Sequence, residues 1–144
     1  MRWKIADFGA TAEGTSKRLQ PTSSCRGTAS YRAPEVLEEG GYSAKSDIWV
    51  FGCIAYELIA GERAFRTDWD TMQYCGSQKW SPKRACPVLA LKSMVLALIA
   101  EFTKICVDDC LKYEWTMRPS ALQLLEALSD VIWRTRLVEP IMWY

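Results

Sequence analysis

The pattern of hydrophobic and polar positions along the chain predicts a mostly helical domain. From Tyr42 to Gly61 the chain reads YSAKSDIWVFGCIAYELIAG, with a polar beginning, an apolar middle and a glycine at the end. Ser43 or Ser46 suits the cap of a helix N-terminus, and Gly61 suits the position just past the C-terminus. Because its middle is apolar on every face, we expect a buried central helix that other elements cover.

Two further helices are predicted in the C-terminal half. Apolar residues recur at helical spacing from Leu91 to Cys106. A last helix begins near Ser120, because Ser120 and Gln123 form the S-x-x-Q pattern of a capping box. The predicted buried stripe of this helix is Leu124, Leu125, Leu128, Val131 and Ile132. Between these helices and the central one, the pattern indicates only a short helix near Asp68–Tyr74.

The N-terminal part of the chain predicts a short strand followed by a long loop. Trp3 and Ile5 alternate with less apolar neighbours, and Gly9 ends this strand-like pattern. From Ala10 to Arg32 the sequence is polar and has neither helical nor strand periodicity. Structureless loops of this length inside compact domains are usually functional or disordered.

Composition narrows the classes of function. The 144 residues carry a formal net charge of +1 and an ordinary share of apolar and charged side chains, as expected for one globular domain. The small net charge gives no reason to expect nucleic acid or a membrane surface as a partner. No apolar run approaches the roughly 20 residues that cross a bilayer. We also recognise no signal peptide after Met1.

Cysteine and histidine usage narrows the classes further. The six cysteines include no C-x-x-C pair, and Cys106 and Cys110, one helical turn apart, lack further metal ligands nearby in sequence. We interpret the cysteines as reduced and packed like small hydrophobes, which predicts an intracellular, cytoplasmic protein. The chain contains no histidine. Ser-His-Asp, Cys-His and histidine-ligated metal chemistry are therefore excluded within these residues.

Four short stretches carry candidate chemistry. Asp7, Phe8 and Gly9 follow the predicted strand; a carboxylate there can ligate Mg²⁺ while the glycine turns the backbone beside a phosphate, and a plain Asp-x-Gly turn is the alternative. GTASYRAPEV closes the long loop, D-x-W-x-x-G lies in the central helix, and CLKYEWTMRPSALQLL leads into the last helix. Since a buried arginine needs a carboxylate partner, Glu35 is a candidate partner for Arg118.

In this order, the stretches together resemble the C-terminal lobe of the protein kinase family. The family's pattern runs through D-F-G, an activation loop, G-T-x-x-Y-x-A-P-E, a D-x-W-x-x-G helix and an R-P that opens the last helix. The resemblance implies a mainly α fold, a kinase C-lobe fragment with a short strand and a long activation loop before the buried central helix. It implies a partial kinase domain over residues 1–134 and a C-terminal tail over residues 135–144.

The resemblance also implies roles in nucleotide binding and in the architecture of the lobe. Asp7 would bind the Mg²⁺ that bridges ATP phosphates, Phe8 would pack to set active or inactive geometry, and Gly9 would complete this cofactor-binding motif. Glu35 and Arg118 would form a structural ion pair between the activation segment and the last helix.

Other implied roles concern the substrate and the catalytic loop. Gly27 to Glu35 would form the wall that receives the substrate residue after the phosphoacceptor. Thr28 would hydrogen-bond the catalytic machinery, a trait of serine/threonine kinases, and a turn threonine is the alternative. Asp47 would brace the catalytic-loop backbone; it is also an aspartate favoured in the first turn of a helix, and both can hold. Trp49 and Gly52 would be structural.

Three hydroxyl residues stand where the family is phosphorylated on its activation loop. They are Thr22, Ser23 and Ser24, of which Ser24, three residues before Gly27, matches best. A phosphate there would order the loop by pairing with arginine, whereas Ser/Thr clusters in loops are often only solvated. The nearby cations are Lys17, Arg18, Arg26 and Arg32.

The 144 residues lack the family's remaining catalytic parts. They contain no G-x-G-x-x-G loop, no V-A-I-K-type lysine before D-F-G and no H-R-D-x-x-x-x-N loop. One magnesium ligand cannot supply a nucleotide pocket, a second metal ligand and a residue that orients the attacking hydroxyl. We therefore expect a fragment of an ATP-dependent serine/threonine protein kinase that neither binds ATP and Mg²⁺ nor phosphorylates protein substrates by itself.

The alternative is a non-catalytic, kinase-like binding or regulatory protein. No domain boundary falls at Met1, which favours the interpretation as a truncated kinase. The complete activation segment and helical part favour the binding protein instead. In either case, an uncovered central helix would expose an apolar patch and promote association.

Overall fold

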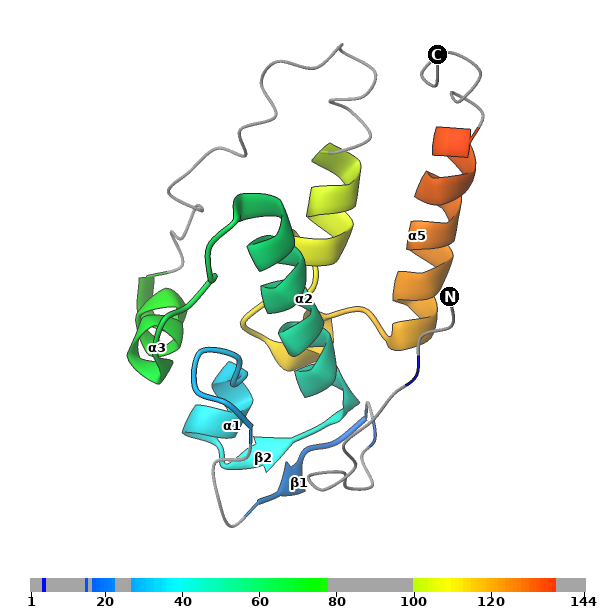
Figure 1. Ribbon diagram of the computed structural model, residues 1–144. Helices are drawn as coiled ribbons and strands as arrows, with labels where there is room; N and C mark the ends of the chain where they lie inside the picture. The colour runs from blue at the N-terminus through cyan, green and yellow to red at the C-terminus, as the bar shows by residue number, and fades with distance from the viewer. Residues whose placement is uncertain (1–3, 5–14, 16, 23–26, 78–99, 137–144) are drawn as a thin grey trace.

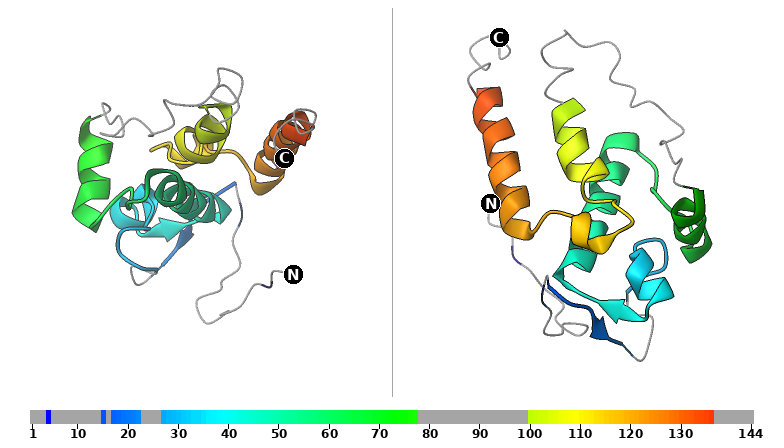
Figure 2. Two further views of the ribbon diagram at one scale, coloured as in Figure 1. Left: turned by 45° about the horizontal axis from the view of Figure 1, so that its top comes forward. Right: turned by 180° about the vertical axis from the view of Figure 1, so that it is seen from behind.

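The computed structural model describes residues 4, 15, 17–22, 27–77 and 100–136. These residues are mostly helical, as the sequence predicts. Helix α2 (Ala44–Ala60) runs through the middle of the molecule, and α1 (Pro34–Glu38) lies beside its N-terminal end (Figure 1). Helices α3 (Asp68–Ser77) and α5 (Ala121–Arg136) stand on opposite sides of α2. Both views in Figure 2 show the same arrangement.

Side-chain and glycine caps define α2 at both ends. The hydroxyl of Ser43 accepts a hydrogen bond from Lys45 N at 3.1 Å, and the hydroxyl of Ser46 accepts one from Ser43 N at 3.0 Å. These bonds satisfy backbone donors that the first helical turn leaves without partners. At the other end, Gly61 takes a left-handed φ of 72° and donates its N–H to Glu57 O. Both predicted serines therefore cap the helix.

A π-helical turn, η1 (Lys104–Asp108), packs against α2 and follows the helical residues 100–103. The residues that follow η1 lie close to α2 at Gly52, where an added Cβ would lie 2.8 Å from Cys110 Cβ and 2.9 Å from a Leu111 methyl carbon. A side chain at this position would therefore push η1 and the residues after it away from α2. The predicted helix from Leu91 is described only from residue 100, and its last part is π-helical.

The central helix is not covered on every face by the described residues. Trp49 and Cys53 are buried, whereas Phe51 and Ile54 are exposed and Leu58 is 81% exposed. The prediction of a helix buried all round is wrong for the described part of the chain. The expectation of exposed apolar side chains on this helix is met.

The last helix begins as predicted but buries a narrower stripe. Ser120 N donates to Gln123 Oε1 at 2.8 Å, and Gln123 N donates to Ser120 Oγ at 3.3 Å, which completes the capping box. Leu124 and Val131 are buried and Leu128 is half-buried. The predicted residues Leu125 and Ile132 are instead 62% and 50% exposed. This part of the prediction is wrong because α5 stands at the edge of the described part of the chain, with α2 and the other described helices on one side of it.

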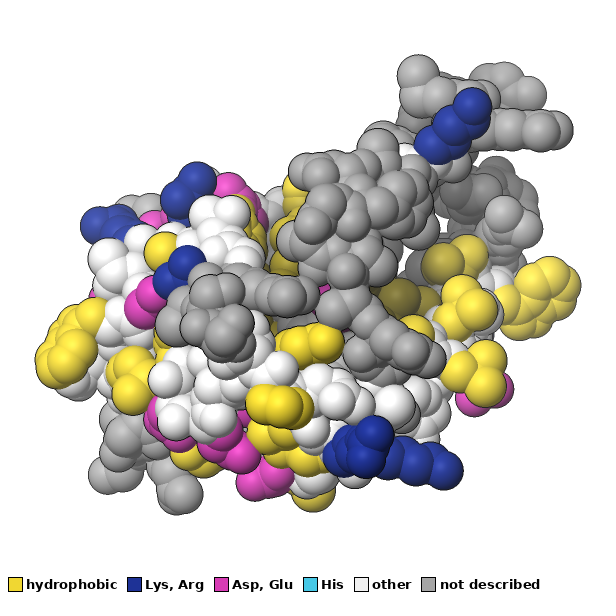
Figure 3. Space-filling view, turned by 90° about the horizontal axis from the view of Figure 1, so that it is seen from below, with side chains coloured by type: hydrophobic (Ala, Val, Ile, Leu, Met, Phe, Trp, Pro, Cys, Tyr) yellow, Lys and Arg dark blue, Asp and Glu magenta, His cyan; other side chains and the backbone are white. Residues whose placement is uncertain are grey.

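Apolar side chains are consequently visible at two opposite edges of the surface, over α3 and over α5 (Figure 3). The exposed large residues there are Trp69 and Met72 on α3, and Leu122, Leu125, Ile132 and Trp133 on α5. No helix among the described residues is long and apolar enough to cross a membrane.

A two-stranded antiparallel sheet interrupts the predicted loop. Strand β1 (Gln20–Pro21) pairs with β2 (Gly41–Tyr42), with Gln20 opposite Tyr42 and Pro21 opposite Gly41. A strand of two residues is too short to produce an alternating pattern, so the prediction of an unbroken loop from Ala10 to Arg32 missed β1. The strand predicted around Trp3 and Ile5 lies outside the described residues.

Among the described residues, three cysteines are buried and free: Cys53, Cys106 and Cys110. Burial raises the pKa of their thiols to about 12, about 11 and about 12, respectively. The interpretation of these cysteines as small hydrophobes is confirmed. The part of the chain that the structure describes holds no group of three or more potential metal ligands.

We expect these thiols to resist alkylation by iodoacetamide in the folded chain at about pH 8, because the reactive thiolate is scarce and the sulfur is buried. The folded-state pKa of each thiol lies above its ordinary value. The three thiols therefore make their full contribution to the stability of the folded chain below about pH 9, and this contribution is lost as the pH rises through about 11 to 12. Site-resolved mass spectrometry with a urea-unfolded control checks the first expectation. Rapid labelling of Cys53 in the folded chain would contradict it.

Candidate functional site

The central feature of the site is a buried ion pair between Glu35 and Arg118. Arg118 Nη1 lies 2.8 Å from Glu35 Oε1, and Nη2 lies 2.8 Å from Oε2. The side chains are 1% and 0% exposed. Two parallel hydrogen bonds fit the planar guanidinium to both carboxylate oxygens. The structure thus joins two candidate residues that are 83 positions apart in the sequence.

All five N–H donors of the Arg118 guanidinium have acceptors. Besides the two bonds to Glu35, Nε donates to Lys112 O at 2.8 Å, Nη1 to Lys45 O at 3.0 Å and Nη2 to Tyr113 O at 3.1 Å. A buried charge is costly unless it is paired and fully hydrogen-bonded, and here it is both. The guanidinium therefore links α1, the first turn of α2 and the chain just before the last helix.

Two side chains at the start of α2 complete this polar cluster. The Ser46 hydroxyl donates to Glu35 Oε1 at 2.7 Å, in addition to capping α2. Lys45 Nζ donates to Arg118 O. Burial, followed by the nearby Arg118 charge, lowers the pKa of Lys45. The cap of α2 and the ion pair are thus one connected hydrogen-bond network.

Trp49 forms the apolar side of the cluster. The guanidinium carbon of Arg118 lies 4.9 Å from the centroid of its ring, within the range of a cation–π contact. The indole stacks on Phe65 at 5.3 Å and meets Tyr74 at 5.9 Å between ring centroids. It is fully buried, and its Nε1 has no hydrogen-bond partner among the described residues. Trp49 therefore connects the ion pair to the aromatic core.

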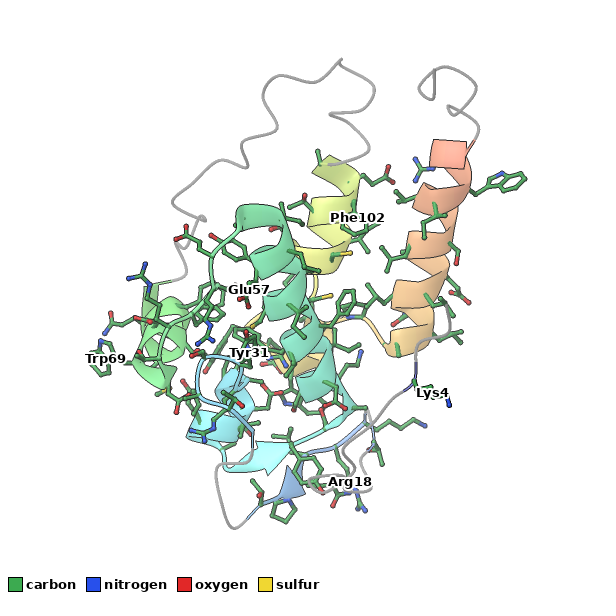
Figure 4. The ribbon with its side chains drawn as sticks, in the orientation of Figure 1. Lys4, Arg18, Tyr31, Glu57, Trp69 and Phe102 are labelled. Atoms are coloured by element: carbon green, nitrogen blue, oxygen red, sulfur yellow. The ribbon has the colours of Figure 1, made fainter. Side chains whose placement is uncertain are left out.

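Three consecutive side chains fasten the loop before α1. Ser30 Oγ donates to Arg66 O at 2.7 Å. The Tyr31 hydroxyl donates to Glu57 Oε2 at 2.6 Å, and Figure 4 shows these two side chains pointing toward one another. Arg32 Nη1 donates to Asp68 Oδ2 at 2.6 Å. This segment is therefore held to the C-terminal part of α2 and to the start of α3.

The partners of this loop were missed by reasoning from the sequence. Glu57 lies 26 positions after Tyr31, and Asp68 lies 36 positions after Arg32. Nothing in the local pattern links residues so far apart. The Glu57 hydrogen bond is the main cause of a raised pKa for the Tyr31 hydroxyl, and the guanidinium carbon of Arg63 lies 5.8 Å from the Tyr31 ring centroid.

Thr28 and Asp47 both lie at the surface. Thr28 O accepts a hydrogen bond from Tyr31 N at 3.2 Å, which closes a turn. Asp47 occupies the first turn of α2, and partial loss of solvent raises its pKa although its side chain is exposed. Neither side chain has a hydrogen bond among the described residues. The turn and helix-terminus interpretations of these residues are thus compatible with the geometry, and so are the roles that the resemblance implies.

The magnesium motif and two candidate phosphorylation sites fall outside the described residues: Asp7, Phe8, Gly9, Ser23 and Ser24. No geometry follows for a metal or nucleotide at these positions. Thr22, the third candidate, is half-buried, and its backbone N–H donates to Gly40 O at 2.8 Å.

Comparison with known proteins identifies the family. The family model described as protein kinase domain matches residues 1–128. Serine/threonine-protein kinase BCK1/SLK1/SSP31 from Saccharomyces cerevisiae is 32% identical over 124 residues, which are 85% of this chain and 8% of that protein. Serine/threonine-protein kinase nekl-2 from Caenorhabditis elegans is 32% identical over 123 residues, 85% of this chain and 31% of the relative.

A third relative, mitogen-activated protein kinase kinase kinase 19 from Mus musculus, is 35% identical over 133 residues, which are 85% of this chain and 9% of that protein. The chain thus spans less than a third of the length of each of these relatives. The family match itself extends from the N-terminus into α5, across every residue of the buried cluster. The chain belongs to the protein kinase family.

Proposed function

We propose that the chain forms the C-terminal-lobe part of an ATP-dependent serine/threonine protein kinase, with the partial kinase domain over residues 1–134 and a tail over residues 135–144. The observation that carries this proposal is the buried ion pair of Glu35 and Arg118. It fixes the end of the Gly27–Glu35 segment against the chain before the last helix. A segment fixed in this way suits the positioning of a protein substrate.

Phosphoryl transfer depends mostly on positioning and on neutralisation of phosphate charge. In the complete enzyme, residues 27–35 would receive the substrate chain just after the phosphoacceptor. Thr28, exposed on this segment, would hydrogen-bond the catalytic machinery, and Asp47 would brace the catalytic-loop backbone. Their surface positions and their lack of side-chain partners among the described residues support these assignments.

Asp7 would hold the Mg²⁺ that bridges the ATP phosphates, within the motif that Phe8 and Gly9 complete. The 144 residues contain no glycine-rich loop, V-A-I-K-type lysine or H-R-D loop. We therefore propose that this chain by itself is inactive and does not bind ATP. Phosphorylation at Thr22, Ser23 or Ser24 would regulate the complete enzyme by pairing with nearby arginines.

A second candidate function is a non-catalytic binding protein. The exposed apolar face of α2, on which Phe51, Ile54 and Leu58 lie, supports this alternative. Contiguous apolar surface commonly marks a site of association. Such a protein would bind a partner through α2 and transfer no phosphate.

The test is a phosphotransfer assay on the complete product of the gene. The transcript is mapped and translated in frame upstream of Met1, and the encoded protein is expressed beside the 144-residue chain. Transfer of labelled phosphate from ATP to serine or threonine of a protein substrate is expected from the complete product alone. Asp7→Asn should abolish this transfer, because it removes the proposed magnesium ligand.

The matched control is Asp109→Asn, which removes an exposed carboxylate and should leave the activity unchanged. Transfer that persists in Asp7→Asn would contradict the proposed metal role. If the complete product transfers no phosphate, the binding protein becomes the better interpretation.

A further inference from the structure

Two side chains of the Gly27–Arg32 segment bind the segment Arg66–Asp68, which leads into α3. Ser30 Oγ donates to Arg66 O, and Arg32 Nη1 donates to Asp68 Oδ2. The two contacts lie two residues apart in each segment. They therefore hold the segments together at two points. The position of one segment therefore depends on that of the other.

Ser30 is held in an unfavourable backbone conformation at the first of these points. Its φ is 77°, in the left-handed region that residues other than glycine rarely adopt. Its side chain is buried, and its hydroxyl makes the 2.7 Å bond to Arg66 O. Such a conformation persists only where surrounding contacts fix it. The contact to Arg66 is thus part of what shapes this turn.

The Arg32 guanidinium donates hydrogen bonds to two different residues. Its Nε donates to Gly27 O at 3.0 Å, which closes the segment on itself, while Nη1 reaches Asp68 at 2.6 Å. Both charged side chains are partly shielded, with 21% and 32% exposure. Both contacts depend on the forked guanidinium, which offers separate donors in fixed directions.

The other end of the contact is itself well fixed. Asp68 is the first residue of α3, where the helix dipole favours a carboxylate. The neighbouring carboxylate of Asp70 accepts hydrogen bonds from the backbone N–H groups of Arg66 and Thr67, both at 2.9 Å. These hydrogen bonds, that from Arg66 first, lower the pKa of Asp70. The start of α3 is therefore a stable anchor for Arg32.

We infer that Arg32 is a positioning residue, which sets the placement of residues 27–30 through its ion pair with Asp68 and so tunes how tightly a peptide substrate is held. The part about the substrate rests on the proposed function. The placement of the loop does not, because it follows from contacts within the chain. Arg32 touches neither nucleotide nor phosphoacceptor in this assignment, so its effect is on substrate binding and not on the transfer step.

The first test measures hydrogen exchange of the backbone N–H groups of residues 28–32 in the 144-residue chain. Arg32→Gln and Asp68→Asn should each accelerate this exchange by about two- to fivefold, the range of a partly exposed ion pair. The double variant R32Q/D68N should be no faster than R32Q alone, because both changes remove the same contact.

Arg66→Gln is the matched control, because its guanidinium makes no hydrogen bond or ion pair with the rest of the described chain. It should leave the exchange unchanged. Wild-type rates in Arg32→Gln, or effects that simply add in the double variant, would overturn the inference.

The second test uses the complete kinase and a peptide substrate. Arg32→Gln should raise the KM for the peptide by about two- to fivefold and leave kcat unchanged, and Arg32→Lys should restore only part of the loss. A fall in kcat at constant KM would overturn the positioning role. If the wild-type protein transfers no phosphate, the proposed function fails, and the exchange experiment alone decides whether Arg32 places the loop.

Discussion

Arg118→Ala is expected to destabilise the folded chain by about 3–5 kcal/mol, the usual cost of removing one partner of a buried ion pair. The variant leaves the Glu35 carboxylate buried with only the Ser46 hydroxyl as a described side-chain partner. It also leaves the carbonyls of Lys45, Lys112 and Tyr113 without the donor that they share. Small domains have total stabilities of about 5–15 kcal/mol, so much of the stability would be lost.

A positive charge at position 118 should not by itself restore the full stability of the folded chain. Arg118→Lys retains one positive charge but has three donors and no planar fork, so it cannot reach both Glu35 oxygens and three carbonyls together. We expect it to recover only part of the stability. Glu35→Gln should also be strongly destabilising, because the guanidinium then lies buried without a countercharge.

Urea unfolding followed by far-ultraviolet circular dichroism measures these effects. Asp109→Asn is the control, because it breaks an exposed ion pair in which Asp109 lies 3.7 Å from Lys112. Pairs of this kind contribute at most about 1 kcal/mol. If Arg118→Ala shifted the unfolding curve no more than Asp109→Asn, the buried pair would not anchor the fold.

The ends of the helices were predictable from the sequence because their signals are local. The capping residues of α2 lie within the first turn, and those of α5 lie three positions apart. Gly61 needs only its own left-handed φ. Each of these features depends on residues that are neighbours in the chain, so the sequence pattern contains the whole interaction.

Contacts between distant segments were predictable only where a buried charged side chain requires a partner of opposite charge. Arg118 needs a carboxylate if it is buried, and the resemblance to the protein kinase family implied that this carboxylate is Glu35. By contrast, Tyr31 and Arg32 carry no feature that selects Glu57 or Asp68 among the other acidic residues. Those partners depend on the path of the loop past α2 and α3. This path cannot be derived from the local sequence pattern.

Burial on α5 could not be derived from the sequence for a related reason. The pattern offered five apolar residues, but the helix packs through a narrow stripe at Leu124, Leu128 and Val131. Whether Leu125 and Ile132 are buried depends on how many neighbours surround the helix, not on its own periodicity.

Trp49→Ala should destabilise the chain by about 3–5 kcal/mol, as for other large aromatic residues removed from a packed interior. The indole is fully buried, stacks on Phe65 and lies against the Arg118 guanidinium, so its removal opens a cavity between the core and the ion pair. Trp49→Phe should cost less, about 1–2 kcal/mol, because it keeps a ring and removes the Nε1 donor that has no partner among the described residues.

Trp69 provides the matched control for Trp49. It is 68% exposed on α3, and Figure 4 shows it pointing away from the molecule. Trp69→Ala should change the free energy of unfolding by no more than about 0.5 kcal/mol. Equal effects of Trp49→Ala and Trp69→Ala in urea unfolding would mean that the indole stacked on the ion pair does not stabilise the core. A large effect of Trp49→Ala with a small one of Trp49→Phe would instead assign the stabilisation to ring packing and not to the indole nitrogen.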